Sequence, residues 1–321
     1  MKTFWLKWRR EIIRGGMLFV LVVALGLWVT NLLRGGRDRM VSEFKDRFGA
    51  FSVNFDAPGR EHGDLWQWRG AVSSSQTIRI RNANGPIAVE RADGNHAEVR
   101  AEKSWRRSSP RSVRLVAEPG PTGVTICALW EGQTSCGSHG DYEGFGGHRN
   151  DVAVRFTVLV PKGVAVDLST MNGALQITGM TGSLKAATLN GGIQVEAAGG
   201  PVAVKTVNGG IDATLGALAP GGAELETVNG AVTVQLPEHV DATLDAESVV
   251  GRVQADLPVQ VTGTVDPKHI RGTLGRGGPT LHVSTVNGEV RLVGIGGGAA
   301  APMKAPWPRH ARPALPPQPP R

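Results

Sequence analysis

The sequence predicts an all-β protein, a β-solenoid that follows one amino-terminal transmembrane helix. A Thr-x-Asn-Gly signature recurs about every 20 residues, and apolar and polar residues alternate around each copy. A period of that length is typical of stacked repeats, and alternation with period two is typical of strands with one buried face. A charge-free apolar run near the start of the chain predicts the helix.

The apolar run, MLFVLVVALGLWVTNLL at residues 17–33, predicts an uncleaved signal anchor over residues 15–33. Five Lys or Arg residues precede the run and three follow it closely. This bias favours a single-pass protein of the inner (cytoplasmic) membrane, with residues 1–14 in the cytoplasm. A cleaved signal peptide is the alternative, although residues 32–34 (Leu-Leu-Arg) occupy the place of a small-x-small cleavage site. In both cases the rest of the chain lies outside the cytoplasm.

The rest of the chain divides into three expected segments. Residues 34–75 are predicted to be a juxtamembrane stalk, either a short amphipathic helix on the membrane surface or a solvated linker. Residues 76–294 contain the repeats and are predicted to form the periplasmic or extracytoplasmic solenoid. Residues 295–321 are rich in Pro and are predicted to be a disordered tail.

The repeat signature has an irregular end. Its glycines fall at positions 173, 191, 209, 230, 251 and 288, so that the spacings are 18, 18, 21, 21 and 37 residues. The last spacing is close to two units, which suggests that one signature is lost between two coils. The copy at 248–251 departs from the pattern, with Val250 where the other copies have Asn. We therefore expect a bulge or a change of cross-section there.

Two architectures fit the repeat. If each Asn-Gly closes a hairpin, the chain is an antiparallel β-meander in which Lys185 faces Glu196. If each Asn-Gly is a solenoid corner, coils stack in parallel, with one ladder of Thr hydroxyls and another of Asn amides. The regular period favours the solenoid. The expected structural turn and ladder residues are Asn84, Gly85, Asn172, Gly173, Asn190, Gly191, Asn208, Gly209, Asn229, Gly230, Asn287 and Gly288. A ligand or ion ladder of Asn residues is the less favoured interpretation.

Three stretches carry a family resemblance: WRGAVSSSQTIRIRNANGPIAV, the TVNGxV units, and IRGTLGRGGPTLHVSTVNGEVRL at 270–292. Together they resemble the bacterial "putative adhesin" family of β-strand repeats, a domain of unknown function, over roughly residues 66–294. The resemblance implies a single-stranded right-handed β-helix. It implies no catalytic, cofactor-binding or metal-binding residue for this chain.

The two cysteines, Cys127 and Cys136, lie nine positions apart. Outside the cytoplasm such a pair most simply forms a disulfide that closes a hairpin, within a loop region of about residues 127–150. A metal site is the alternative, and its possible further ligands are His139, Asp141, Glu143, His148 and Asp151. Their spacing matches no standard zinc signature, so the disulfide is favoured.

The net charge of +7 comes from the two ends of the chain. Residues 1–40 carry eight basic and two acidic residues, residues 302–321 carry four basic residues, and the middle is therefore mildly acidic. This distribution argues against nucleic acid as a partner. Within the middle, a basic cluster is either a contact for an anionic surface or a solvated loop. Its candidate contact residues are Arg100, Lys103, Arg106, Arg107 and Arg111.

No catalytic motif is present, and residues 157–306 contain no Phe, Trp or Tyr on which a sugar would stack. We therefore expect a non-catalytic envelope protein without cofactor, a binding or structural scaffold for an unknown envelope protein or glycan. One alternative is an envelope-stress sensory or regulatory module, which would need a membrane partner because the cytoplasmic end is short. The other is a polysaccharide-active β-helix enzyme, since carboxylates such as Glu224, Glu226 and Asp245 are available.

Overall fold

The computed structural model describes residues 55–130, 133–136, 150–261 and 266–295, all within one compact unit, Val53–Arg321. These residues form 21 strands and one short 3-10 turn, η1 (Pro110–Ser112), which confirms the all-β class. In these ranges no helix is long and apolar enough to cross a membrane. The predicted anchor, cytoplasmic end and Pro-rich tail lie outside the described residues.

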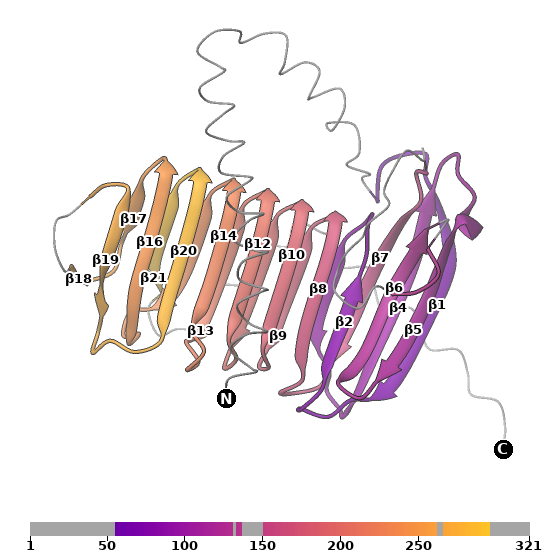
Figure 1. Cartoon of the computed structure of the whole chain (residues 1–321), viewed down its shortest axis with the longest axis horizontal. Coiled ribbons are helices and arrows are strands. Elements are labelled where there is room, and N and C mark those ends of the chain that lie inside the picture. Colours follow the sequence, from indigo (N-terminus) through magenta and orange to yellow (C-terminus); the bar gives the residue numbers. More distant parts are fainter. Residues whose placement is uncertain (1–54, 131–132, 137–149, 262–265, 296–321) are drawn as a thin grey trace, which may run out of the picture. The chain divides into compact units, whose positions relative to one another are not determined.

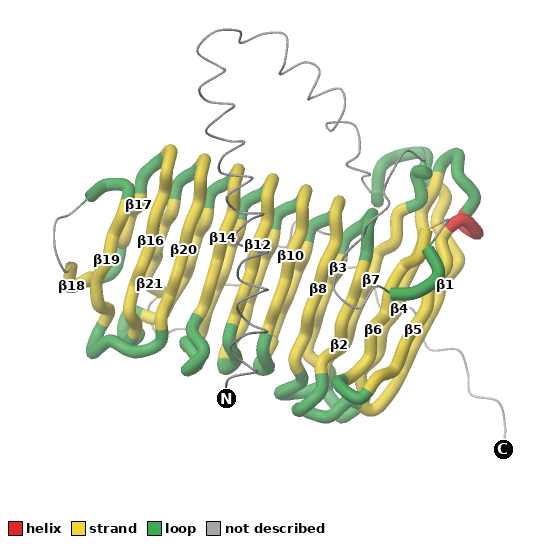
Figure 2. Tube along the Cα trace, viewed as in Figure 1, coloured by secondary structure: helices red, strands yellow, loops and turns green. Residues whose placement is uncertain are grey.

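The strands form two sheets (Figures 1 and 2). The first sheet has the order β1 (Glu61–Ala71), β4 (His96–Trp105), β7 (Ala153–Val160), β3 (Ile87–Arg91), β9 (Leu175–Met180), β11 (Ile193–Ala198), β13 (Ile211–Ala217), β15 (Val232–Pro237), β21 (Val290–Ile295), β17 (Val253–Ala255). The second has the order β18 (Val259–Val261), β19 (His269–Leu274), β16 (Ala242–Val250), β20 (Thr280–Asn287), β14 (Ala223–Asn229), β12 (Val202–Asn208), β10 (Leu184–Asn190), β8 (Ala165–Asn172), β2 (Thr77–Arg81), β6 (Gly123–Trp130), β5 (Val113–Gly120).

Each repeat contributes one strand to each sheet, and the Thr-x-Asn-Gly corner joins the two strands. Neighbouring coils pair in parallel and in register, so that Thr188 lies opposite both Thr170 and Thr206. Strand β10 pairs with β8 and β12 rather than with β11. The stacking confirms the β-solenoid and shows that the meander, with Lys185 opposite Glu196, is wrong. The right-handed sense of winding stays a prediction.

The core lies between the sheets and is built from small aliphatic side chains. In β10, Leu184, Ala186 and Thr188 are buried, whereas Lys185 and the other alternate residues face solvent. Stacking places Leu184 beside Val202 of the next coil, and such rows run through the whole buried cluster. A slip of one residue would turn the polar set inward, so burial of one face fixes the register.

The fold begins earlier than the sequence predicts. Strand β1 (Glu61–Ala71) lies inside the range 34–75 that was expected to be a stalk, and it pairs antiparallel with β4. β4 pairs antiparallel with β7, and β5 pairs antiparallel with β6. The expected boundary at residue 76 is therefore too late. β1 lacks the repeat signature and is mostly exposed, with Trp66 and Trp68 packed against the core, so its sequence does not resemble a repeat strand.

The last coils are stacked out of sequence order. Strand β20 pairs with β14 on one side and with the earlier strand β16 on the other (Figure 1). The signature at 285–288 therefore stacks directly on the signature at 227–230. The 37 residues between the last two signature glycines contain the antiparallel strand β19 and no parallel coil without a signature, so the expectation of one lost signature is wrong. The degenerate copy at 248–251 lies beyond both, where the ladder ends at Val250.

Candidate functional site

The six predicted Asn residues form one amide ladder at the corners. The Nδ2 atom of Asn190 donates to Oδ1 of Asn172 at 2.8 Å, and Asn208 donates in the same way to Asn190 at 2.8 Å. The ladder continues through Asn229 to Asn287, and it begins where Asn172 donates to Asn84 at 3.2 Å. Because each amide already binds its neighbours, the Asn residues hold coils together.

The Thr hydroxyls do not bond to one another, contrary to our expectation. Each donates to the Gly carbonyl of the neighbouring corner: Thr188 to Gly173 at 3.0 Å, and Thr206 to Gly191 at 2.9 Å. In the degenerate copy Ser248 donates to Gly288 at 2.8 Å, which preserves the bond without the Thr. Buried hydroxyls need such a partner, since an unpaired one would cost free energy.

The signature Gly is required by close approach of backbones. Among the described residues, Gly173, Gly191, Gly209, Gly230 and Gly288 do not have positive φ, so they do not form the hairpin turn that favours Asn-Gly. A Cβ atom on Gly191 would instead overlap the carbonyl oxygen of Gly173. At the next position a Cβ is tolerated, because Ala174 and Ala231 occupy it in other coils.

Cys127 and Cys136 form a disulfide, with their Cα atoms 5.9 Å apart. With Leu129 and Val116 they make a small apolar cluster separate from the main core. Of the alternative metal ligands, residues 139, 141, 143 and 148 lie outside the described residues. In the part of the chain that is described, no group of three or more His, Cys, Asp or Glu could hold a metal ion.

The basic cluster is divided by the fold. Arg100 binds Glu98 at 2.6 Å, and Lys103 is buried, with its Nζ 2.5 Å from Asp64 and 3.0 Å from the carbonyl oxygen of Pro110. These two charges are therefore compensated inside the protein. Arg107 and Arg111 are exposed, as is Arg106, whose side chain donates to the carbonyl oxygen of Pro58.

The loop of this cluster wraps around one carboxylate. Asp151 accepts backbone hydrogen bonds from Arg106 and Arg107 at 3.1 Å and from Ser108 at 2.9 Å. Burial raises the pKa of Asp151, but these hydrogen bonds outweigh it and hold the pKa below its usual value. The backbone N–H groups of residues 106–108 therefore already bind an anionic group of the protein, the carboxylate of Asp151. The five residues do not form one free anionic-surface contact.

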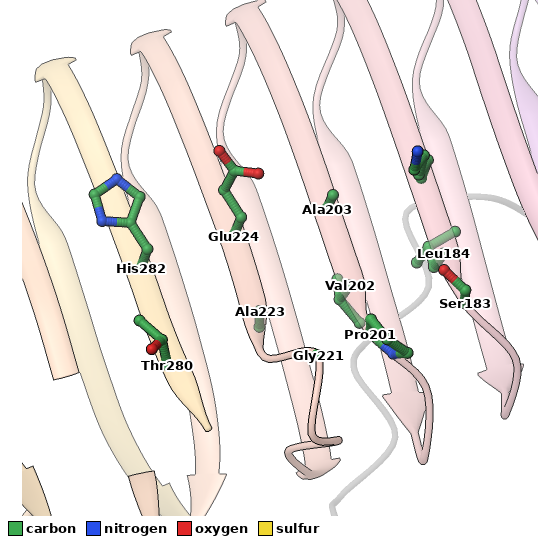
Figure 3. Close-up of a pocket in the computed structure, with 11 residues that line it drawn as sticks. Ser183, Leu184, Pro201, Val202, Ala203, Gly221, Ala223, Glu224, Thr280 and His282 are labelled. Carbon is green, nitrogen blue, oxygen red and sulfur yellow. The ribbon is translucent and has the colours of Figure 1, made fainter. Parts of the chain in front are cut away.

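The outer face of the second sheet contains a shallow groove (Figure 3). In one row across the sheet, Lys185, Ala203, Glu224 and His282 lie on the neighbouring strands β10, β12, β14 and β20. The short side chain of Ala203 leaves a hollow of about 280 Å³ between Lys185 on one side and Glu224 with His282 on the other. Its remaining lining residues are Ser183, Leu184, Pro201, Val202, Gly221, Ala223 and Thr280.

Glu224, which lines the groove, and the neighbouring Glu226 are held by one lysine. Lys205 Nζ lies 2.9 Å from Glu224 Oε1 and 3.0 Å from Glu226 Oε2. Burial raises the pKa of Glu226, and Glu224 raises it further. Burial also acts to raise the pKa of Glu224, but hydrogen bonds with Lys205 and Glu226 lower it overall. Glu224 is therefore the group that keeps its negative charge beside the groove.

The cationic wall is not compensated in this way. Lys185 lies between Asp167 and Ala203 in register. Asp167 is already bound by Arg81, with two N–O distances of 2.9 and 3.0 Å. Among the described residues no carboxylate lies within ion-pair distance of Lys185. The groove therefore presents a free ammonium group opposite the Glu224–His282 wall.

A second cluster of ionisable side chains lies beside the groove, around Asp245. His282 has Nδ1 3.7 Å from Asp245 and Nε2 4.0 Å from Glu226. Asp245 also accepts from His269 at 2.7 Å and from Arg271 at 3.2 Å. Burial raises the pKa of Asp245, but these hydrogen bonds outweigh it and the pKa is lowered.

Glu224, Glu226 and Asp245 stand out in the sequence as available carboxylates, but the sequence does not show how they are arranged. Lys185 and His282 were not predicted as members of one site. The period of 18 to 21 residues could have placed Lys185 beside Ala203 and Ala203 beside Glu224. Nothing in the period places His282 next, because β20 is stacked out of order.

Residues 148–293 match the family model "Toastrack DUF4097". The predicted resemblance to a β-repeat domain family of unknown function is thereby confirmed for this part of the chain. A comparison with curated proteins found no match.

Two solved structures are also similar. A putative cell adhesion protein from Clostridium sporogenes ATCC 15579 is 13% identical, with 72% of this chain and 100% of that chain covered and a TM-score of 0.40. A putative adhesin from Bacteroides fragilis NCTC 9343 is 10% identical, with 72% and 97% covered and a TM-score of 0.28. At these TM-scores neither likeness carries an argument about function.

Proposed function

We propose that this chain is a non-catalytic, adhesin-like scaffold of the cell envelope that binds an acidic glycan on the outer face of its second sheet. The observation that carries the proposal is the groove over Ala203, with the uncompensated Lys185 on one wall and Glu224 with His282 on the other. The match of residues 148–293 to the Toastrack DUF4097 family model supports a β-scaffold.

The chemistry of the groove selects the ligand class. A free ammonium group favours a carboxylate or another acidic group on the ligand. Glu224 accepts hydrogen bonds and His282 can donate or accept, as the hydroxyl groups of a sugar require. No aromatic residue occurs between positions 157 and 306, so binding depends on charge and hydrogen bonds without ring stacking. The affinity should therefore fall as salt concentration rises.

Membrane anchoring is the second part of the proposal. Residues 15–33 would hold the chain in the inner membrane, and the solenoid would lie on the extracytoplasmic side. The support is the apolar run with its flanking positive charges. Fractionation of cells that express the full chain, or the chain without residues 15–33, tests this part. We expect only the full chain in the membrane fraction, and equal partitioning of both would contradict the anchor.

The glycan proposal is tested with the full chain in a mild detergent. Titration with tri-galacturonic acid, and with a neutral glucose trisaccharide as comparison, should give tighter binding of the acidic probe. Lys185→Gln should weaken that binding about tenfold, as loss of one charge-assisted contact predicts. Lys162→Gln is the matched control, since Lys162 is exposed but does not line the groove. Equal affinity of the two variants, or binding of neither sugar, would overturn the proposal.

A further inference from the structure

The connection between β15 and β20 is unlike every comparable connection in the stack. In the neighbouring coils, the segments that link the first sheet back to the second are 181–183, 199–201 and 218–222, three to five residues long. From the end of β15 at Pro237 to the start of β20 at Thr280, the link comprises residues 238–279. We call residues 238–279 the insertion.

The coil on either side of the insertion is otherwise regular. β20 stacks on β14 with Thr285 opposite Thr227 and Asn287 opposite Asn229, the register that all other coils use. β21 stacks on β15 in the same way. A corner of five residues in place of the insertion would therefore complete an ordinary coil.

The insertion covers the outer edge of this last coil. β16 pairs with β20 and β17 pairs with β21, both in parallel. The backbone N–H groups of Gly288 and Val290 donate across to Val250 and Arg252 at 3.1 and 3.0 Å. Ser248 donates to Gly288, and Arg252 lies 3.5 Å from Glu289. Without the insertion these edge groups would have no partner from the chain.

On the side of the insertion that faces away from β20 and β21, its strands do not offer an edge on which a further coil could stack. β17 and β18 have three residues each, and β19 runs antiparallel to β16. Val250 occupies the Asn position, so that the amide ladder cannot continue. Short strands and interrupted pairing are the means by which natural sheets avoid edge-to-edge association.

We propose that the insertion is an edge guard, and that the β20–β21 edge beneath it pairs with a second copy of this chain when the guard is removed. The edge consists of β20 and β21, strands of eight and six residues, whose backbone groups on this side would lose their partners in β16 and β17 if the insertion were removed. Its outward side chains include the uncharged Ser284, Val286 and Val293 as well as His282 and Arg291. A second copy brings the same edge and thus the same unpaired donors and acceptors.

The test replaces residues 238–279 of the full chain with the corner sequence of residues 218–222, Leu-Ala-Pro-Gly-Gly. In the same detergent we expect a cooperatively folded β protein whose particle mass, measured by light scattering, is at least twice that of the unmodified chain. A second deletion variant also carries Ser284→Lys and Val286→Lys, two outward positions on the edge strand. Charge repulsion should return its mass to that of the unmodified chain.

Each outcome decides the proposal. A deletion variant that does not fold shows that the insertion is part of the solenoid rather than a guard. A folded variant of unchanged mass shows that the edge does not pair with a second copy. Increased mass that persists in the double-lysine variant places the contact elsewhere than on this edge. Only increased mass that the lysines reverse supports the edge guard.

Discussion

The stack of repeats and the antiparallel amino-terminal region are held together by different kinds of contact. In the stack, each coil repeats one Thr, one Asn and one Gly, and each of these groups binds the neighbouring coil. The antiparallel region, β1 and β4 to β7, has no such repeat. It is held by individual contacts, such as the disulfide Cys127–Cys136 and the ion pair of Lys103 with Asp64.

This difference follows from the neighbours that each region packs against. A coil inside the stack packs on coils with the same residues, so one short signature is sufficient to specify its contacts. The amino-terminal end of the stack has no identical neighbour, and larger side chains close it. The described aromatic residues accordingly lie in the amino-terminal region, among them Phe55, Trp66 and Phe156. The two regions should therefore respond differently to substitutions, and the largest effect is expected at the corners.

Gly191→Ala should disrupt the stack by about 3 kcal/mol of unfolding free energy, because the new Cβ overlaps the backbone of the neighbouring corner. Gly192→Ala is the matched control at the same corner, where the nearest atom to a Cβ is 3.5 Å away. Urea unfolding of the two variants measures the difference. Equal stability of both would show that backbone contact does not determine the corner residue.

Cys127→Ser combined with Cys136→Ser should cost about 2–3 kcal/mol, the usual effect of opening so short a loop. Hydrogen exchange should locate the loss of protection in β5 and β6, while the coils from β8 to β15 stay protected. The unmodified protein under reducing conditions is the comparison. Uniform loss of protection through the stack would contradict the separation of the two regions.

Asn208→Ala should cost about 1 kcal/mol, because it breaks the ladder in the middle and removes two amide hydrogen bonds. Asn287→Ala is the control, since it lies at the end of the ladder and donates one bond to Asn229. The loss at Asn287 should be about half as large. Thermal unfolding of both variants measures the two losses of stability. A larger loss for Asn287→Ala than for Asn208→Ala would show that the stabilisation does not depend on the number of amide hydrogen bonds in the ladder.

The sequence was sufficient for the stack because its information is local and repeated. The recurrence of Asn172, Asn190 and Asn208 predicted both the parallel register and the amide ladder. It did not reveal why Gly follows Asn, because the close approach of two corners exists only after stacking. The sequence also did not place β1 in the fold or β20 between β14 and β16, since both depend on pairing between distant segments. The groove was not predicted for the same reason, because His282 lies beside Glu224 only when β20 pairs with β14.

The smallest expected effect is a difference in pH dependence between the two regions. The pKa of Asp151 in the amino-terminal region is lowered, so its stabilising effect is present above the unfolded value of 3.8 and is lost as pH falls below it. The pKa of Glu226 in the stack is raised above 4.5, so its effect has the opposite sign and is lost as pH rises through the folded pKa. Both groups are partly solvated, and we expect changes below about 1 kcal/mol.

Two isosteric variants separate these effects. Asp151→Asn should reduce the gain in stability between pH 3 and pH 5, because the amide cannot acquire the charge that the loop of residues 106–108 binds. Glu226→Gln should increase that gain, because the buried carboxyl no longer has to lose its proton beside Glu224. Urea unfolding at a series of pH values measures both slopes. Changes of the same sign in the two variants would show that one charge environment extends over both regions, and changes of opposite sign would confirm that each region sets the pKa of its own carboxyl group.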